Sequence, residues 1–138
     1  MIKLTDEMRE ALANALADRA PVILAYVAPD GQPNVSFRGT TQVHSDDQIA
    51  IWARNPEGGL LKGIAANPKI ALLYRNPETR IAWQFQGRAH LEEDEQVRST
   101  VYDSSPEVER NADPERKGKA ILLDVDRVIQ RGQAIMER

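Results

Sequence analysis

Basic and hydrogen-bonding side chains that could hold an anion recur between residues 38 and 62. Arg38 is followed at alternate positions by Thr40 and Gln42, so all three side chains would share one face of an extended strand. Farther along, Arg54 and Lys62 flank an Asn-Pro-Glu-Gly-Gly sequence. A guanidinium or ammonium group with hydroxyl and amide neighbours is suited to binding a phosphate. The segment therefore indicates a site for an anionic ligand.

The order of elements around these residues strengthens that interpretation. Residues 48–54 alternate as a strand, residues 55–59 form a break, and residues 60–66 are an apolar stretch typical of a short helix. A helix N-terminus presents free backbone N–H groups and the positive end of the helix dipole. We therefore expect the strand to deliver the chain to a junction that favours a phosphate.

The remaining patterns predict a mainly β protein with flanking helices. A helix over residues 5–18 would be capped by Thr5, and a second helix would cover residues 94–104. The run at 22–28 is apolar throughout, which is typical of a strand buried on both faces. Gly87 is the expected bend in the longest strand. The six predicted strands, which fit a small barrel in a single domain over residues 1–138, are 22–28, 34–44, 48–54, 70–74, 80–92 and 120–128.

The strand predicted at 34–44 has two distinct faces. Its odd-numbered positions carry most of the apolar side chains, and its even-numbered positions are polar. We expect the odd face to pack and the even face, with Arg38, to meet water or a polar ligand. The odd face consists of Val35, Phe37, Gly39, Thr41 and Val43.

Composition narrows the classes of function. The 138 residues carry a net charge of −3 with 41% hydrophobic residues, which argues against a nucleic-acid partner. The chain has no cysteine, so disulfides and a cysteine nucleophile are excluded. No apolar run approaches the roughly 20 residues that span a bilayer, so we expect a cytoplasmic protein with no membrane partner.

Two sequence segments carry a resemblance to a known family. They are residues 66–74, Ala-Asn-Pro-Lys-Ile-Ala-Leu-Leu-Tyr, and residues 87–89, Gly-Arg-Ala. With their separation and the order of elements over residues 20–130, the chain resembles the FMN-binding split barrel of the pyridoxamine 5′-phosphate oxidase-like superfamily. This resemblance implies a six-stranded split β-barrel, an FMN cofactor and a homodimer with its ligand sites at the interface.

The resemblance also implies particular cofactor-binding residues. Arg38 would open a segment that lines FMN, and the end of the third strand would touch the flavin. We expect Trp83, on the long strand at 80–92, to serve the dimer interface and ligand retention, because aromatic residues are common interface anchors. The expected cofactor-binding residues are Arg38, Gly39, Thr40, Thr41, Ala53, Arg54, Lys62 and Trp83.

The chain departs from the family's oxidases at three places. Gly59 and Leu60 stand where those oxidases have adjacent arginine and lysine for the FMN phosphate, and Lys62 comes two residues later. Val43 stands where they hold the substrate phosphate with a lysine. Their arginine-bearing C-terminal segment has no counterpart in residues 130–135. We therefore expect no true pyridoxine phosphate oxidase activity.

Each candidate residue also has a simpler interpretation. Arg38, Arg54 and Lys62 could be solvated surface charges. Trp83 could be a packing residue, since large aromatic side chains dominate cores and interfaces. The two histidines are isolated in the sequence, so no metal site is predicted.

Three functions remain open. The first is an FMN-dependent oxidoreductase acting on small molecules, whose catalytic residues the sequence does not identify. A flavin carries the electron chemistry itself, so no distinctive set of catalytic side chains is needed. The second is a non-catalytic module that binds FMN or haem. The third is a reductase dependent on the deazaflavin F420, whose long anionic tail favours a more basic groove.

Overall fold

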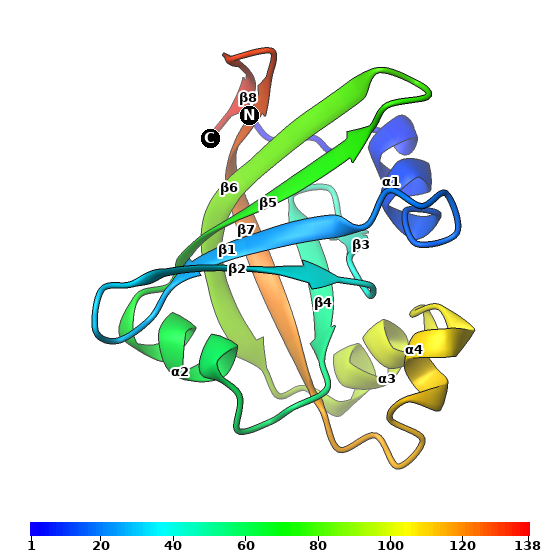
Figure 1. Ribbon diagram of the computed structural model, residues 1–138, viewed down its shortest axis with the longest axis vertical. Helices are drawn as coiled ribbons and strands as arrows, with labels where there is room; N and C mark the ends of the chain where they lie inside the picture. Colours follow the sequence, from blue (N-terminus) through cyan, green and yellow to red (C-terminus); the bar gives the residue numbers. More distant parts are fainter.

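The computed structural model describes all residues from Met1 to Arg138, and its eight strands form one antiparallel sheet (Figure 1). The strand order is β2-β1-β5-β6-β7-β4-β3, with β8 paired to β7. The strands are β1 (Val22–Val27), β2 (Pro33–Arg38), β3 (Gln42–Ser45), β4 (Gln48–Ala53), β5 (Lys69–Asn76), β6 (Ile81–Glu92), β7 (Lys119–Gln130) and β8 (Gln133–Glu137).

Four helices flank the sheet. They are α1 (Asp6–Ala13), α2 (Gly59–Ala66), α3 (Glu95–Asp103) and α4 (Glu107–Asn111). Thr5 caps α1 as expected, since its side chain accepts a hydrogen bond from the Met8 N–H. The charged segment at 106–118, for which the sequence predicted no element, contains α4. None of the helices has the length and apolar character needed to cross a bilayer.

The sheet is strongly curved where its two longest strands meet. The pairing of β6 with β7 shifts register between Gln86 and Gly87. A Cβ at Gly87 would lie 2.0 Å from the Asp124 carbonyl oxygen, so the strands approach too closely there for any side chain. The bend expected at Gly87 is thus explained by a bulge against β7.

The main core fills the concave side of the sheet. Phe85, Leu72 and Leu123 are fully buried there, and α2 adds Leu60 and Ile64. On the opposite side of β4 and β7, α3 covers a separate apolar cluster that includes Trp52 and Tyr102. The two helices α2 and α3 therefore cover different parts of the sheet, and the strand β4 lies between them (Figure 1).

The mainly β fold with flanking helices is confirmed, with eight strands in place of the expected six. The predicted strand 34–44 is two strands, because the chain crosses to β4 between them. Thr40 Oγ1 accepts a hydrogen bond from Trp52 N at 2.9 Å and donates to Trp52 O at 3.1 Å. The other additional strand, β8, follows a turn at Arg131 and Gly132, both of which have positive φ angles.

The expectation that one face of residues 34–44 packs throughout is wrong. Val35 and Phe37 are 72% and 69% exposed, whereas Val43 is buried. Between β2 and β3, at Gly39–Thr41, the chain passes from one edge of the sheet to the other. Odd-numbered side chains therefore face outward in β2 and inward in β3. Residues 22–28 are likewise not buried on both faces, since Ile23 and Ala25 remain partly exposed beside β2.

Candidate functional site

A cavity of about 290 Å³ lies where β1, β2 and the end of β4 meet the start of α2. We call it the Arg38 cavity. Its lining is mixed, with a guanidinium, a phenol and several amide or hydroxyl groups beside small apolar residues. The lining residues are Tyr26, Asn34, Val35, Ser36, Arg38, Ala53, Asn55, Gly58, Gly59 and Leu60.

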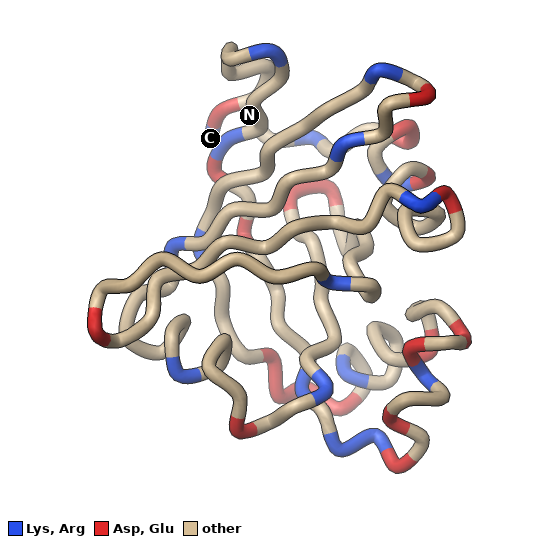
Figure 2. The backbone as a smooth tube through the Cα atoms, in the orientation of Figure 1, with Lys and Arg blue, Asp and Glu red and all other residues tan.

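Arg38 is the cationic residue of this cavity. Its Nε donates a hydrogen bond to Ser36 Oγ at 3.2 Å, and it forms no ion pair with a carboxylate. Partial burial lowers the pKa of Arg38 below its ordinary value; nearby Tyr26 acts to raise it, and Arg54 acts to lower it further. Strands β1 and β2 are otherwise free of Lys, Arg, Asp and Glu (Figure 2), so Arg38 is their one charged residue.

The start of α2 contributes backbone donors to the same cavity. Gly58 is the N-cap, and it has no side chain to satisfy the first N–H groups of the helix. The predicted strand-to-helix junction is therefore present, and it lies beside Arg38. Gly59 and Leu60, which replace the family's basic pair, line the cavity without adding charge.

Tyr26 is a site residue that the sequence interpretation missed. A Cβ at Gly59 would lie 2.8 Å from the Tyr26 hydroxyl oxygen, and one at Gly63 would lie 2.5 Å from its ring. The two glycines, four residues apart on α2, therefore make room for the phenol. The sequence held two signals for this role. Tyr26 is the one phenol in an otherwise apolar strand, and Gly59 and Gly63 fall on one face of the short helix α2.

A second cavity, of about 190 Å³, lies on the other side of Arg38. We call it the Arg54 cavity. Arg54 is 55% exposed, and its Nε lies 3.9 Å from Glu109 Oε2 on α4. The cavity is lined by Phe37, Arg38, Gly39, Thr40, Trp52, Arg54, Asn55 and Glu109.

Several predicted site residues hold the strands together. Thr40 and Thr41 are buried; Thr40 bonds the Trp52 backbone, and Thr41 Oγ1 donates to the Arg38 carbonyl at 3.4 Å. Gln42 Nε2 donates to the Thr40 and Val101 carbonyls. The predicted polar face of Arg38, Thr40 and Gln42 is therefore wrong, because the hydrogen-bonding groups of Thr40 and Gln42 are used within the fold.

Trp83 and Lys62 lie away from both cavities. Trp83 is 2% exposed and stacks on Tyr74 with ring centroids 5.5 Å apart, so its expected role at the cofactor and the interface is wrong for this fold. The alternation of β6 explains this, since Trp83 and Phe85 point inward while Gln84 and Gln86 point outward. Lys62 is exposed on α2 and lines neither cavity.

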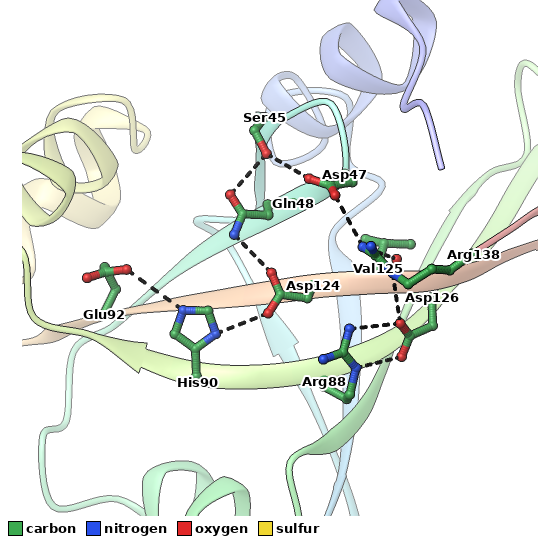
Figure 3. A network of polar contacts seen from close by, with 10 residues as sticks. All are labelled: Ser45, Asp47, Gln48, Arg88, His90, Glu92, Asp124, Val125, Asp126 and Arg138. Atoms are coloured by element: carbon green, nitrogen blue, oxygen red, sulfur yellow. Dashed lines mark hydrogen bonds and ion pairs between the residues drawn. The ribbon is translucent and has the colours of Figure 1, made fainter. Parts of the chain in front are cut away.

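A polar network on the outer side of β6 and β7 contrasts with the Arg38 cavity (Figure 3). Arg88 donates two hydrogen bonds to Asp126, at 3.0 and 2.9 Å. Nearby, His90 Nδ1 lies 3.3 Å from Asp124 and its Nε2 lies 3.7 Å from Glu92. The structure holds no group of three or more histidine, cysteine or acidic residues arranged to bind a metal ion.

Comparison with known proteins now assigns the family. The sequence profile described as pyridoxamine 5′-phosphate oxidase matches residues 4–131. The chain therefore belongs to the pyridoxamine 5′-phosphate oxidase family. No curated protein matches the sequence.

Solved structures with the same fold come from several bacteria. HupZ of Group A Streptococcus is 20% identical, with a TM-score of 0.69 over 94% of this chain and 95% of that one. A candidate pyridoxamine 5′-phosphate oxidase of Lactobacillus delbrueckii is 22% identical, with a TM-score of 0.67 over 92% and 93% of the two chains. General stress protein 26 of Bacillus anthracis is 17% identical, with a TM-score of 0.65 over 90% and 93%. At these identities, the likeness establishes the split-barrel fold.

Proposed function

We propose that this protein binds FMN, with the FMN phosphate in the Arg38 cavity, and acts as an FMN-dependent oxidoreductase on small molecules. The observation that carries the proposal is the guanidinium of Arg38, which is half-buried, has no carboxylate partner and lies beside the unsatisfied N–H groups of α2. Such a charge is costly without a counter-ion. A phosphate would supply one.

The residues present fit a phosphate, although they differ from the family's basic pair. Arg38 offers a forked cation, the start of α2 offers backbone N–H groups, and Tyr26 offers a hydroxyl. Where the family's oxidases have arginine and lysine, this chain has Gly59 and Leu60, which offer only neutral backbone N–H donors. We therefore expect binding that depends mainly on one arginine.

The proposed oxidoreductase role rests on the cofactor. When bound, FMN supplies the electron transfer through its isoalloxazine ring. Ala53 and Gly39 lie on either side of Arg38, at positions where backbone groups can line a flat ring. The protein's own contribution is to bind, orient and shield the ligand, with no acid–base residue assigned.

Pyridoxine phosphate is not the proposed substrate. Val43, at the position of the family's substrate-binding lysine, is buried in the main core. It supplies no cation for a substrate phosphate. We expect turnover with NADH or NADPH and a small acceptor, and negligible hydrogen peroxide production from pyridoxine phosphate.

A second copy of the chain would complete the site. The Arg38 cavity is at the lower limit of small-molecule cavities, so it can enclose only part of a ligand as large as FMN. Cross-strand pairing places Val35 and Phe37 of β2 on the same outer face as Ile23 and Ala25 of β1. The face continues onto β5 and β6. We call it the outer apolar face, and it comprises Ile23, Ala25, Val35, Phe37, Ala71, Leu73, Gln84 and Gln86.

This face has the composition expected of an interface. Apolar side chains from three strands meet the glutamines of a fourth, and Phe37 and Val35 remain largely exposed in one copy. Because two-fold symmetry would bring one face against its equivalent, a homodimer is the simplest partner. Light scattering should give about twice the 15.4 kDa mass of one chain; a monomer that retains FMN would contradict the shared site.

An absorbance spectrum of the freshly purified protein tests the cofactor. Flavin, haem and F420 have distinct bands, so the spectrum separates the proposal from a haem-binding module and an F420-dependent reductase. For a colourless preparation, added FMN should raise the melting temperature, since a ligand that binds the native state stabilises it. No shift at about 1 mM FMN, far above an ordinary cofactor Kd, would contradict the proposal. Bound FMN with no turnover of either nicotinamide would support the non-catalytic module.

A further inference from the structure

The Arg54 cavity already contains a carboxylate of the protein itself. Glu109 is 23% exposed at its side chain, and its Oε2 lies 3.9 Å from Arg54 Nε. This separation exceeds the range of an N–H···O hydrogen bond. No hydrogen bond fixes the Glu109 carboxylate at a closer distance. The contact is therefore a loose ion pair whose acidic partner can be exchanged.

The Glu109 carboxylate lies against the backbone at Gly39. A Cβ at Gly39 would lie 2.3 Å from Glu109 Oε1, so a side chain at position 39 would require the Glu109 side chain to move away. Gly39 directly follows Arg38 in the segment between β2 and β3. An acidic oxygen is thus accommodated between the Gly39 backbone and the guanidinium of Arg54.

The helix that carries Glu109 is held by contacts that do not involve Glu109. The single O–H of Tyr102 is shared between the carbonyls of Arg110 and Asp113, whose oxygens lie 3.0 and 2.9 Å from Oη. These bonds fix α4 against α3. Rotation about the side-chain bonds of Glu109 can therefore vacate the cavity without moving the helix.

We propose that the Arg54 cavity is a second anion subsite, which takes a carboxylate or phosphate group of a small-molecule substrate in exchange for Glu109. The inference rests on the proposed function, because a substrate held here would lie beside a flavin bound through Arg38. The two cavities share Arg38 and Asn55, so ligands in them would be neighbours. A volume of about 190 Å³ suits one small charged group with part of its carbon skeleton against Phe37 and Trp52.

Glu109 then sets the preference of the subsite. While it stays in the cavity it neutralises Arg54 and repels a second anion, so only a ligand that binds well elsewhere in the site would displace it. Removing the charge of Glu109 should strengthen the binding of any small anion. Inorganic phosphate is the simplest probe, and its binding can be followed at the Gly39 amide resonance.

The test compares Glu109→Gln with Glu107→Gln, its neighbour on α4 that does not line the Arg54 cavity. We expect Glu109→Gln to bind phosphate about fivefold to tenfold more tightly than wild type, as a lost like-charge contact near the surface implies. Glu107→Gln should match wild type. Adding Arg54→Met to Glu109→Gln should remove the gain.

The proposal is overturned if Glu109→Gln and Glu107→Gln bind phosphate equally, or if the gain survives Arg54→Met. Because the titration needs no FMN, it is independent of the proposed cofactor. A phosphate gain in a protein that never binds FMN would retain the subsite and reject the cofactor. FMN binding without a gain in phosphate affinity for Glu109→Gln would retain the cofactor and reject the subsite.

Discussion

Two arginines on different strands of the same sheet have opposite surroundings. Arg88, on β6, is held by two hydrogen bonds to Asp126, and Asp126 also accepts one from Arg138 at 3.2 Å (Figure 3). Arg38, on β2, has one hydrogen bond to a serine and no carboxylate partner. The protein supplies the counter-charge at β6 and β7, and it leaves the charge at Arg38 unbalanced.

The pKa values of Arg88 and Arg38 are shifted in opposite directions, which reflects the same difference in surroundings. The hydrogen bond from Arg88 to Asp126 raises the pKa of Arg88, and the charge of Asp126 raises it further. Burial lowers the pKa of Arg38, and the charge of Arg54 adds to that effect. A paired arginine needs no further ligand, whereas a half-buried unpaired one is stabilised by an anion from outside. The contrast distinguishes a structural network from a candidate site.

The largest effect is expected at the outer apolar face, which would complete the Arg38 cavity by dimerisation. Phe37→Asp introduces two charges into a two-fold interface and removes two aromatic anchors, so the dimer should weaken by about 3 kcal/mol or more. Sedimentation at micromolar concentration measures the change. Val108→Asp, at an exposed valine on α4, is the matched control and should remain dimeric. Equal association of the two variants would place the interface elsewhere.

Asp113 is an acidic residue whose carboxylate is fully hydrogen-bonded within the fold, so replacing it should affect stability and leave ligand binding unchanged. Asp113 accepts hydrogen bonds from Trp52 Nε1 and from the Lys117 and Gly118 N–H groups. Burial acts to raise the pKa of Asp113, but these bonds and the charge of Arg54 together bring it below its ordinary value of 3.8. Asp113→Asn should lower the free energy of unfolding by about 2 kcal/mol at pH 7.

The pH dependence follows from the sign of that shift. A carboxyl whose pKa is depressed on folding stabilises the native state fully above its unfolded pKa, and this stability is lost as pH falls through the folded pKa. The stability gap between wild type and Asp113→Asn should therefore be constant near neutrality and shrink below about pH 4. Denaturant titrations at several pH values measure the gap. A gap that widens in acid would contradict the assignment.

Replacing Arg38 and Arg88 in turn should distinguish a residue that binds the ligand from one that only stabilises the fold. Arg38→Ala should weaken FMN binding by about 2 kcal/mol, the scale of a lost charge-assisted hydrogen bond. Arg88→Ala should leave FMN affinity unchanged, because Asp126 already neutralises Arg88. Fluorescence titration with FMN gives both values. Similar losses in the two variants would mean that the effect is indirect.

The smallest effect concerns the ligand-free protein. Arg38→Met removes a half-buried charge and its repulsion with Arg54, so the melting temperature should rise by roughly one to three degrees. Arg88→Met removes a paired charge and should give no such rise. Thermal unfolding without ligand measures both. A fall in the melting temperature for Arg38→Met would show that Arg38 is satisfied within the fold.

Much of the fold could be predicted because its signals are local. The Thr5 cap, the break at residues 55–59 before the helix predicted at 60–66, and the bend at Gly87 could each be predicted from the residue types at those positions. The inward face of β6 also follows from its alternation. The cap, the break and the alternation depend on neighbours within a few residues, which local sequence patterns report. At Gly87 the glycine marks the bend, although the strand that approaches it is distant in the sequence.

The errors arise where chain segments distant in sequence decide the outcome. Thr40 binds the backbone of Trp52, and this contact divides one predicted strand into two and uses the hydrogen-bonding groups of the Thr40 hydroxyl within the fold. Tyr26 became a site residue only through its packing against two glycines of α2. Nothing in the order of residues identifies Glu109 as the partner of Arg54.

The most direct test of the central claim compares FMN with riboflavin, which has the same ring and lacks the phosphate. If the unpaired charge of Arg38 receives the phosphate, wild-type protein should bind FMN at least about 30-fold more tightly than riboflavin, and Arg38→Ala should remove most of that difference. Fluorescence titration of both ligands against both proteins gives the four affinities. Equal binding of FMN and riboflavin by the wild-type protein would contradict the account.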